Sequence, residues 1–268
     1  METMTKTTVF HDRFFVAVSL CAVAVATAAA NPVLAAGCNF EPQGEGRVGA
    51  IIDARSLRMD DGREVRLAGI ETVATVGRAD AASALSALVA GQSVTLRGET
   101  DAPDRYGRQP AFVFAESASA SVQSLLLTQG AALVSGTVAD AECAAELIAA
   151  ESAARQARRG VWADAAVIKN AESAGDILTR IGQFTVVEGK VLSVRQAGAV
   201  TYVNFGRRWT RDFAVTISRR VSAAFEAAGI ALKSLENKRI RVRGFVEARG
   251  GPRIEALRVG QIELVGGN

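Results

Sequence analysis

The stretch RVGAIIDARSLRMDDGREVRLAGI, residues 47–70, decides the fold of the first half of the chain. Apolar and polar residues alternate on both sides of Asp61 and Gly62. Alternation with a period of two is typical of a half-buried β-strand, and Asp-Gly is a preferred turn between antiparallel strands. The stretch therefore predicts a β-hairpin closed at this dipeptide.

The pattern after the hairpin predicts further strands and three helices. Helical spacing at 78–90 ends at Gly91, which is a suitable C-terminal cap. The remaining elements are expected as strands at 92–98 and 110–115 and as helices near 118–129 and 138–159. Several strands with helices packed on them fit a small barrel of the OB type.

The second half of the chain repeats this order of elements. We expect strands at 183–196, 199–205 and 212–218, a helix at 219–228, and strands at 238–248, 252–257 and 261–265. The expected fold class is therefore α+β, mainly β with helices, with two OB-like barrels in tandem. The expected domains are residues 37–164 and 183–268, joined by an Ala-rich linker at 165–182.

The first 36 residues have the layout of a secretory signal. Two early basic residues precede an apolar run from 14 to 30, which Pro32 and a small-residue segment follow. The run is slightly short of the roughly 20 residues that span a bilayer, so we expect cleavage rather than a retained anchor. The mature protein is then expected to begin near residues 36 to 38 and to be periplasmic or secreted.

Loss of this leader would remove the single histidine, His11, and one of three cysteines. Catalysis by Ser/His/Asp or Cys/His groups would be excluded, as would zinc sites that need histidine. The two remaining thiols, Cys38 and Cys143, suggest one disulfide in an oxidising compartment. The alternative is a lipoprotein signal that ends at Cys38, with lipid on that residue and Cys143 free.

Charge is divided unevenly along the chain. Residues 37–164 carry 12 basic and 17 acidic side chains, whereas residues 165–268 carry 17 basic and 9 acidic ones. The net charges are −5 and +8, so the second half has the electrostatic signature of a polyanion binder.

Three segments of the first half stand in order, IDARSL at 52–57, VRLAGIET at 65–72 and DRYGR at 104–108. Together they resemble the staphylococcal nuclease (thermonuclease) family. The tail supports this resemblance, because a long Ala/Glu/Arg helix that ends in RGVW at 159–162 is similar to the closing helix of the family. The resemblance covers residues 47–162 and implies a first barrel of staphylococcal nuclease type.

The resemblance implies a site for metal-assisted phosphodiester hydrolysis. In this family two aspartates hold calcium, a glutamate activates or positions water, and two arginines neutralise charge in the transition state. The arginines match Arg66 and Arg108, and the second aspartate matches Glu71. The chain has Arg55 where the first aspartate is expected and Ala74 where the glutamate is expected.

These departures imply a degenerate site. A guanidinium repels a divalent cation, and loss of a general base alone typically lowers the rate by about 10² to 10⁴. Arg55, Arg66 and Arg108 could instead form a cluster for a phosphate or another anion. Alternatively, Arg66 and Arg108 pair with neighbouring acids such as Glu71 and hold the barrel together.

Calcium remains the expected cofactor only if the activity survives. Asp53 stands two residues before Arg55, which occupies the position of the first family aspartate. Side chains two apart on a strand share a face, so Asp53 and Glu71 would then be the calcium ligands. Otherwise we expect no cofactor.

Candidate binding residues in the second half fall in two groups. Trp209 lies among Arg207, Arg208 and Arg211, close to Tyr202, and OB barrels bind single strands by stacking bases on aromatic side chains within a basic groove. The arginines that alternate on one predicted strand are expected to share an exposed face, and they are Arg239, Arg241 and Arg243. A solvated loop and a solvated charged face are the alternatives.

Three functions follow from these features. The leading expectation is an exported protein that binds nucleic acid or another anionic polymer and has lost phosphodiesterase activity. The second is an active calcium-dependent nuclease with rearranged ligands. The third is a periplasmic module with a structural or protein-interaction role.

Overall fold

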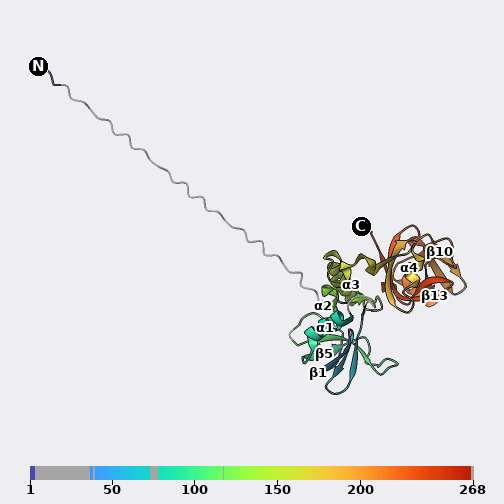
Figure 1. Cartoon of the computed structure of the whole chain (residues 1–268), viewed down its shortest axis with the longest axis horizontal. Coiled ribbons are helices and arrows are strands. Elements are labelled where there is room, and N and C mark those ends of the chain that lie inside the picture. The colour runs from blue at the N-terminus through green and yellow to red at the C-terminus, as the bar shows by residue number, and fades with distance from the viewer. Residues whose placement is uncertain (4–36, 39, 73–77, 117, 267–268) are drawn as a thin grey trace. The chain divides into compact units, whose positions relative to one another are not determined.

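The computed structural model describes residues 1–3, 37–38, 40–72, 78–116 and 118–266. The described residues from Gly37 onward lie in one compact unit (Figure 1). The predicted leader therefore lies almost wholly outside the described residues, as does Ala74. Within the described ranges, no helix is both long and apolar enough to cross a membrane.

The first sheet is a closed five-stranded barrel in the order β1-β2-β3-β6-β5. β3 and β6 run parallel, and the other neighbours are antiparallel. The predicted OB-type barrel is thus confirmed for the first half, and it is closed. Its strands are β1 (Pro42–Asp53), β2 (Ser56–Met59), β3 (Glu64–Leu67), β5 (Ser93–Arg97) and β6 (Gln109–Ala115).

Three helices pack with this barrel, and two of them begin later than their periodicity predicts. The side chains of Ser121 and Asp140 accept the backbone N–H groups of Ser124 and Cys143, so the helices start after these caps. The helices are α1 (Arg78–Val89), α2 (Val122–Gln129) and α3 (Ala141–Gln156). A two-stranded sheet, which was not predicted, pairs β4 (Ile70–Glu71) with β7 (Leu133–Val134).

Asp61 and Gly62 close the β2–β3 hairpin, as predicted. Gly62 has a φ of 90°, which glycine adopts without strain. The apolar run before it was predicted as one strand, but it turns back after Asp53, whose Oδ1 accepts the N–H of Arg55 at 2.8 Å. The stretch therefore forms three strands, and Ile52 at the turn is 43% exposed.

The start of the described body is tied to α3 by a disulfide between Cys38 and Cys143. Both residues are buried in the core of the first barrel. The predicted disulfide is confirmed, and a sulfur used in this bond cannot carry the lipid of the alternative interpretation.

The second sheet has eight strands in the order β10-β11-β12-β14-β13-β9-β8, with β15 also paired to β13. β12 and β14 run parallel in this sheet, as β3 and β6 do in the first barrel. The predicted helix is α5 (Arg219–Ala227), which follows β12. The strands are β8 (Ile168–Asn170), β9 (Phe184–Lys190), β10 (Ser193–Ala197), β11 (Val200–Asn204), β12 (Ala214–Ser218), β13 (Arg239–Arg249), β14 (Gly251–Ala256) and β15 (Ile262–Leu264).

This second sheet is not hydrogen-bonded into a closed ring across the described residues. The stretch 183–196, predicted as one strand, breaks into β9 and β10. Val191 donates to the carbonyl of Lys238 on one side, and Leu192 donates to that of Asn204 on the other, at 2.9 and 2.8 Å. The chain therefore passes from the side of β13 to the side of β11 at these two residues, and the predicted OB-like strand order is kept.

The stretch 165–182, predicted as a linker, contains a 3-10 turn, β8 and the short helix α4 (Ala174–Leu178). β8 pairs in parallel with β9, so this stretch adds a strand to the second sheet. Buried residues from both halves also form one apolar cluster, which includes Leu133, Trp162 and Val186. The domain boundaries themselves remain a prediction.

Three further 3-10 turns are Gly160–Ala163, Leu232–Leu235 and Val259–Gln261.

Candidate functional site

Two residues of the first barrel, Arg55 and Glu71, meet at the end of β4. Arg55 forms an ion pair with Glu71, and its Nη1 also lies 3.4 Å from the carbonyl oxygen of Ile70. The two paired side chains are only 17% and 15% exposed. Burial raises the pKa of Glu71 above its ordinary value, which outweighs the opposite effect of Arg55, and the nearby Asp53 raises it further.

This arrangement does not fit a calcium ion. The carboxylate of Glu71 is already engaged by Arg55, and one oxygen of Asp53 accepts a backbone N–H. Calcium takes six to eight oxygen ligands, and carboxylates in its sites must be free of competing cations. The described residues hold no group of three or more His, Cys, Asp or Glu side chains placed to bind a metal.

Arg108 and Arg66 are also engaged within the barrel. Arg108 donates from Nε and Nη2 to Asp104 Oδ2 at 2.9 and 2.7 Å, and Asp104 Oδ1 accepts the backbone N–H groups of Tyr106 and Arg108. The hydrogen bond from Arg108 lowers the pKa of Asp104. Arg66 Nη1 donates to Ser56 on the adjacent strand at 3.3 Å. Arg108 therefore has a carboxylate partner, as the alternative interpretation expected, whereas Arg66 bonds to a hydroxyl and Arg55 is the residue that pairs with Glu71.

The expectation of an exposed arginine stripe on β13 is wrong for two of its three residues. Arg241 is 6% exposed and Arg243 is fully buried, while Arg239 stays at the surface. β13 lies between β9 and β15, which carry Glu188 and Glu263, and α3 brings Glu151 against it. The alternation was predicted correctly, but the face it creates is covered.

The covered face is an ion-pair network. Arg243 pairs with Glu151 at 2.8 Å and with Glu263 at 3.0 Å. Arg241 pairs with Glu263 at 2.8 Å and with Glu188 at 2.7 Å. Burial by itself would raise the pKa of Glu188, but hydrogen bonds from Arg239 and Arg241 outweigh it and lower the pKa. Arg241 and Arg243 are therefore buried and paired within the fold, and they are not exposed to a polymer.

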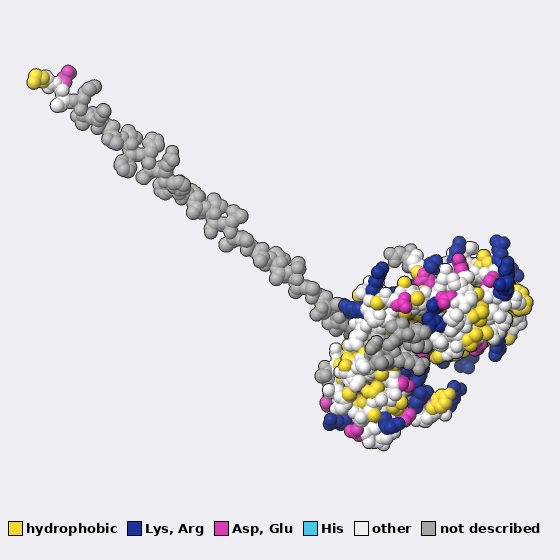
Figure 2. Space-filling view, in the orientation of Figure 1, with side chains coloured by type: hydrophobic (Ala, Val, Ile, Leu, Met, Phe, Trp, Pro, Cys, Tyr) yellow, Lys and Arg dark blue, Asp and Glu magenta, His cyan; other side chains and the backbone are white. Residues whose placement is uncertain are grey.

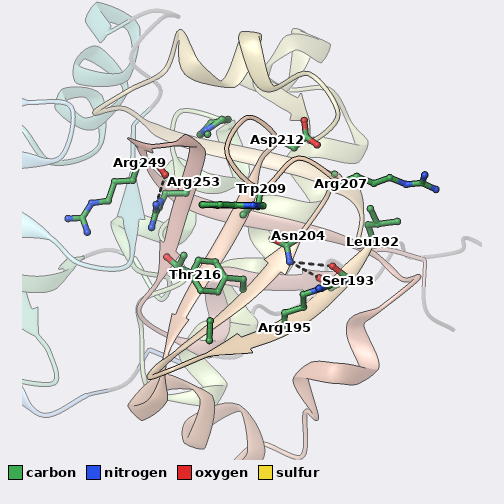
Figure 3. Close-up of a pocket in the computed structure, with 16 residues that line it drawn as sticks. Leu192, Ser193, Arg195, Asn204, Arg207, Trp209, Asp212, Thr216, Arg249 and Arg253 are labelled. Atoms are coloured by element: carbon green, nitrogen blue, oxygen red, sulfur yellow. Dashed lines mark hydrogen bonds between the residues drawn. The ribbon is translucent and has the colours of Figure 1, made fainter.

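A pocket of about 700 Å³ lies on the second sheet (Figure 3). Its floor is one face of β10, β11 and β12, because side chains two apart on a strand point to the same side. Arg195 is the register partner of Tyr202, and Tyr202 of Thr216. In the adjacent row Ser193 pairs with Asn204, and Asn204 Nδ2 donates to the Ser193 hydroxyl at 3.3 Å.

A loop and two further strands complete the pocket. The connection between β11 and β12 supplies Trp209, which is 78% exposed, together with Arg207. In Figure 3 the indole of Trp209 lies across the middle of the pocket. Arg249, the last residue of β13, and Arg253 on β14 lie to one side of it, and Arg207 lies to the other.

Asp212 shapes the loop that carries Trp209. Its Oδ2 accepts the backbone N–H of Arg208 at 2.7 Å, which folds the loop back on itself. A side chain at Gly206 would meet this carboxylate, since a Cβ there would lie 2.1 Å from Asp212 Oδ2. The glycine and the aspartate together therefore present the indole to solvent.

The pocket is basic, and three of the four arginines that line it form no ion pair among the described residues. Across the described ranges, Arg195 and Arg207 form no ion pair or side-chain hydrogen bond, and Arg253 donates only to the carbonyl of Arg249. Arg249 lies 3.9 Å from Glu247, and both are exposed. Lys and Arg side chains, dark blue in Figure 2, are frequent on the visible surface of this second half.

The pocket unites three of the predicted binding residues with three that were missed. Tyr202, Arg207 and Trp209 line it, whereas Arg208 and Arg211 belong to the same loop but do not line the pocket. One signal was available, because two predicted strands joined by a short turn would pair as a hairpin and place a residue opposite Tyr202. The missed residues are Arg195, Arg249 and Arg253.

Comparison with known proteins identifies the first half. Residues 64–164 match the family model described as staphylococcal nuclease homologue. No curated protein matches the chain. The match runs from β3 through α3 and thus includes Arg66, Glu71 and Arg108. Residues 64–164 of this chain are therefore similar to staphylococcal nuclease homologues.

Proposed function

We propose that this protein is exported and binds single-stranded nucleic acid through the pocket of its second sheet, and that its nuclease-type barrel no longer cleaves phosphodiester bonds. One observation carries the proposal. An exposed indole and the Tyr202 ring share a pocket with arginines that have no carboxylate partner within 3.5 Å among the described residues. A nuclease-like fold in the same chain is consistent with a nucleic-acid ligand.

The chemistry of the pocket suits a polymer of bases and phosphates. Aromatic rings stack on the face of any base, with about 1 to 3 kcal/mol per stacked base. Guanidinium groups donate in a fork that matches two phosphate oxygens. Cations on both sides of Trp209 would contact phosphates on both sides of a stacked base.

The loss of hydrolysis follows from the pairing of Arg55 with Glu71. An ion pair at this position supplies the carboxylate with a cation from the chain itself. The three matched residues Arg66, Glu71 and Arg108 then support the barrel rather than a reaction.

Export is supported by the leader pattern and by the disulfide. Disulfides persist in oxidising compartments such as the periplasm, and the bond between Cys38 and Cys143 is buried. The compartment would thus be one in which the protein meets extracellular or periplasmic polyanions.

Fluorescence anisotropy with a labelled single strand of about 12 nucleotides tests the binding proposal. We expect salt-dependent binding, and we expect Trp209→Ala to weaken it roughly 5- to 150-fold, which corresponds to about 1 to 3 kcal/mol. The matched control is Arg220→Ala, an exposed arginine on α5 outside the pocket, which should bind as the unaltered protein does.

Two further measurements, polysaccharide binding and strand cleavage in calcium, distinguish this proposal from the alternative functions. Stronger binding of a sulfated polysaccharide than of the single strand would assign the pocket to another anionic polymer. Cleavage of the strand in calcium that a chelator abolishes would reject the loss of hydrolysis. Absence of binding and cleavage would leave the protein-interaction function.

A further inference from the structure

Glu146 on α3 is a buried carboxylate with no basic side chain beside it. Its side chain lies in the interior and the residue is 9% exposed. One oxygen, Oε2, accepts the backbone N–H groups of Gly37 at 2.6 Å and Cys38 at 3.2 Å. The other accepts the hydroxyl of Ser124. Throughout the described part of the chain, no Lys or Arg side chain pairs with it.

The nitrogen of Gly37 is held at this carboxylate by two independent features. A Cβ on residue 37 would lie 2.7 Å from the carbonyl oxygen of Glu142, so glycine alone allows the chain to approach α3 this closely. The next residue, Cys38, is bonded covalently to Cys143 on the same helix.

The buried carboxylate of Glu146 accepts hydrogen bonds only from neutral donors, so its negative charge has no positive charge beside it among the described residues. Buried charges in proteins are normally paired with an opposite charge, because desolvation is costly. The cation that this site lacks can come from the chain itself. The small residues Ala35 and Ala36 precede Gly37, and secretory leaders are cleaved after such residues.

We propose that a leader peptidase cleaves the bond between Ala36 and Gly37, and that the new α-ammonium of Gly37 forms a buried ion pair with Glu146. Cleavage adds one water, leaving a carboxylate on Ala36 and an amine on Gly37. An α-amine has an ordinary pKa of about 7.7 to 8.0, so it is protonated at neutral pH. The ion pair exists only in the processed chain, so processing stabilises the mature fold. This inference shares the expectation of export but is independent of the binding pocket.

The N-terminal residue of the exported protein tests the cleavage site directly. Intact mass and N-terminal sequencing are expected to show a chain that begins at Gly37. A chain that begins at any other residue, or that carries lipid on Cys38, would overturn the proposal. Loss of DNA binding in a pocket variant would leave this result unchanged.

Thermal unfolding tests the ion pair. We compare the chain that begins at Gly37 with the same chain extended by Ala36 and with its Nα-acetylated form. Both changes should lower the Tm by about 2 to 8 °C, because each removes the ammonium from Glu146. The stability advantage of the unmodified chain should disappear as pH rises through the raised pKa of the ammonium, above about pH 8.

Glu146→Gln supplies the decisive variant. In this background the Tm difference between the unmodified and acetylated chains should vanish. Glu142→Gln is the matched control, because Glu142 is exposed on the same helix, and it should keep the difference. An equal difference in both variants would show that Glu146 is not the partner of the ammonium. If Glu146→Gln does not fold, an unchanged Tm on acetylation of the unaltered chain still rejects the proposal.

Discussion

The two sheets share an order of strands but use their arginines in opposite ways. In the first barrel, Arg55 and Arg108 are paired with Glu71 and Asp104. In the pocket of the second sheet, Arg195 forms no ion pair within the described residues. The comparison teaches that strand order does not decide whether a basic residue supports the fold or meets a ligand. The carboxylates that the neighbouring elements bring to it decide this.

The buried network of β13 is a third case and an extreme one. There, Arg241 and Arg243 are fully covered, and carboxylates from α3, β9 and β15 surround them. A paired arginine should therefore affect stability when it is removed, and an unpaired one should affect binding.

The largest expected effect is on the stability of the buried network. Arg243→Ala leaves Glu151 without its closest cation, and breaking a buried pair typically costs about 3 to 5 kcal/mol. Urea unfolding at neutral pH measures this cost. Arg239→Ala is the control, because its side chain is 57% exposed and a surface pair contributes at most about 1 kcal/mol. Equal losses in both variants would break the distinction between buried and surface pairs.

The second prediction concerns the ion pair of the first barrel. Arg55→Asp should remove the pair and place a carboxylate beside Glu71 and Asp53, so weak calcium binding is expected, with a Kd of roughly 10⁻⁴ to 10⁻³ M. Isothermal titration calorimetry measures it. Arg58→Asp, which changes an exposed arginine on β2, should bind no calcium at this site. Calcium binding by the unaltered protein with a similar affinity would contradict our account of Arg55.

A smaller effect is expected at the pocket. Arg207→Ala should weaken binding of a single strand about fivefold and lower the slope of log K against log salt by about 0.7, because one phosphate contact is lost. Its unfolding free energy should not change, since it has no described partner to lose. Anisotropy titrations at several salt concentrations measure both binding quantities. Arg211→Ala, in the same loop but outside the pocket, should have a smaller effect.

The smallest effect is expected at the surface pair of Arg108 and Asp104. The pKa of Asp104 is lowered by the hydrogen bond from Arg108. A carboxyl with a lowered folded pKa contributes stability that is present above its unfolded pKa and is lost as pH falls through the folded value. NMR titration should therefore show the Asp104 pKa below its usual range, and Arg108→Ala should return it to that range. An unchanged pKa in the variant would show that backbone donors dominate.

Local pattern predicted most elements of this protein. The predicted strands and helices of both halves lie within a few residues of their expected positions, whereas β4, β7, β8 and α4 were not predicted. The disulfide was predicted from the two cysteines expected in the mature chain. The family match at residues 64–164 includes two of the three short segments on which the resemblance rested, those at 65–72 and 104–108. Such features depend on neighbours within a few residues, or on residue types alone, so periodicity and composition suffice to predict them.

Tertiary structure decided whether each arginine is paired with a carboxylate or exposed to solvent. The alternation of Arg239, Arg241 and Arg243 shows that they share a face, but not that Glu151, distant in sequence, covers it. Likewise, the sequence places Tyr202 and Trp209 near arginines, whereas only the sheet order brings Arg253 to the same pocket. An amino-acid pattern determines where a side chain points along its own element. Whether a guanidinium meets a carboxylate or solvent depends on elements that arrive from elsewhere in the chain.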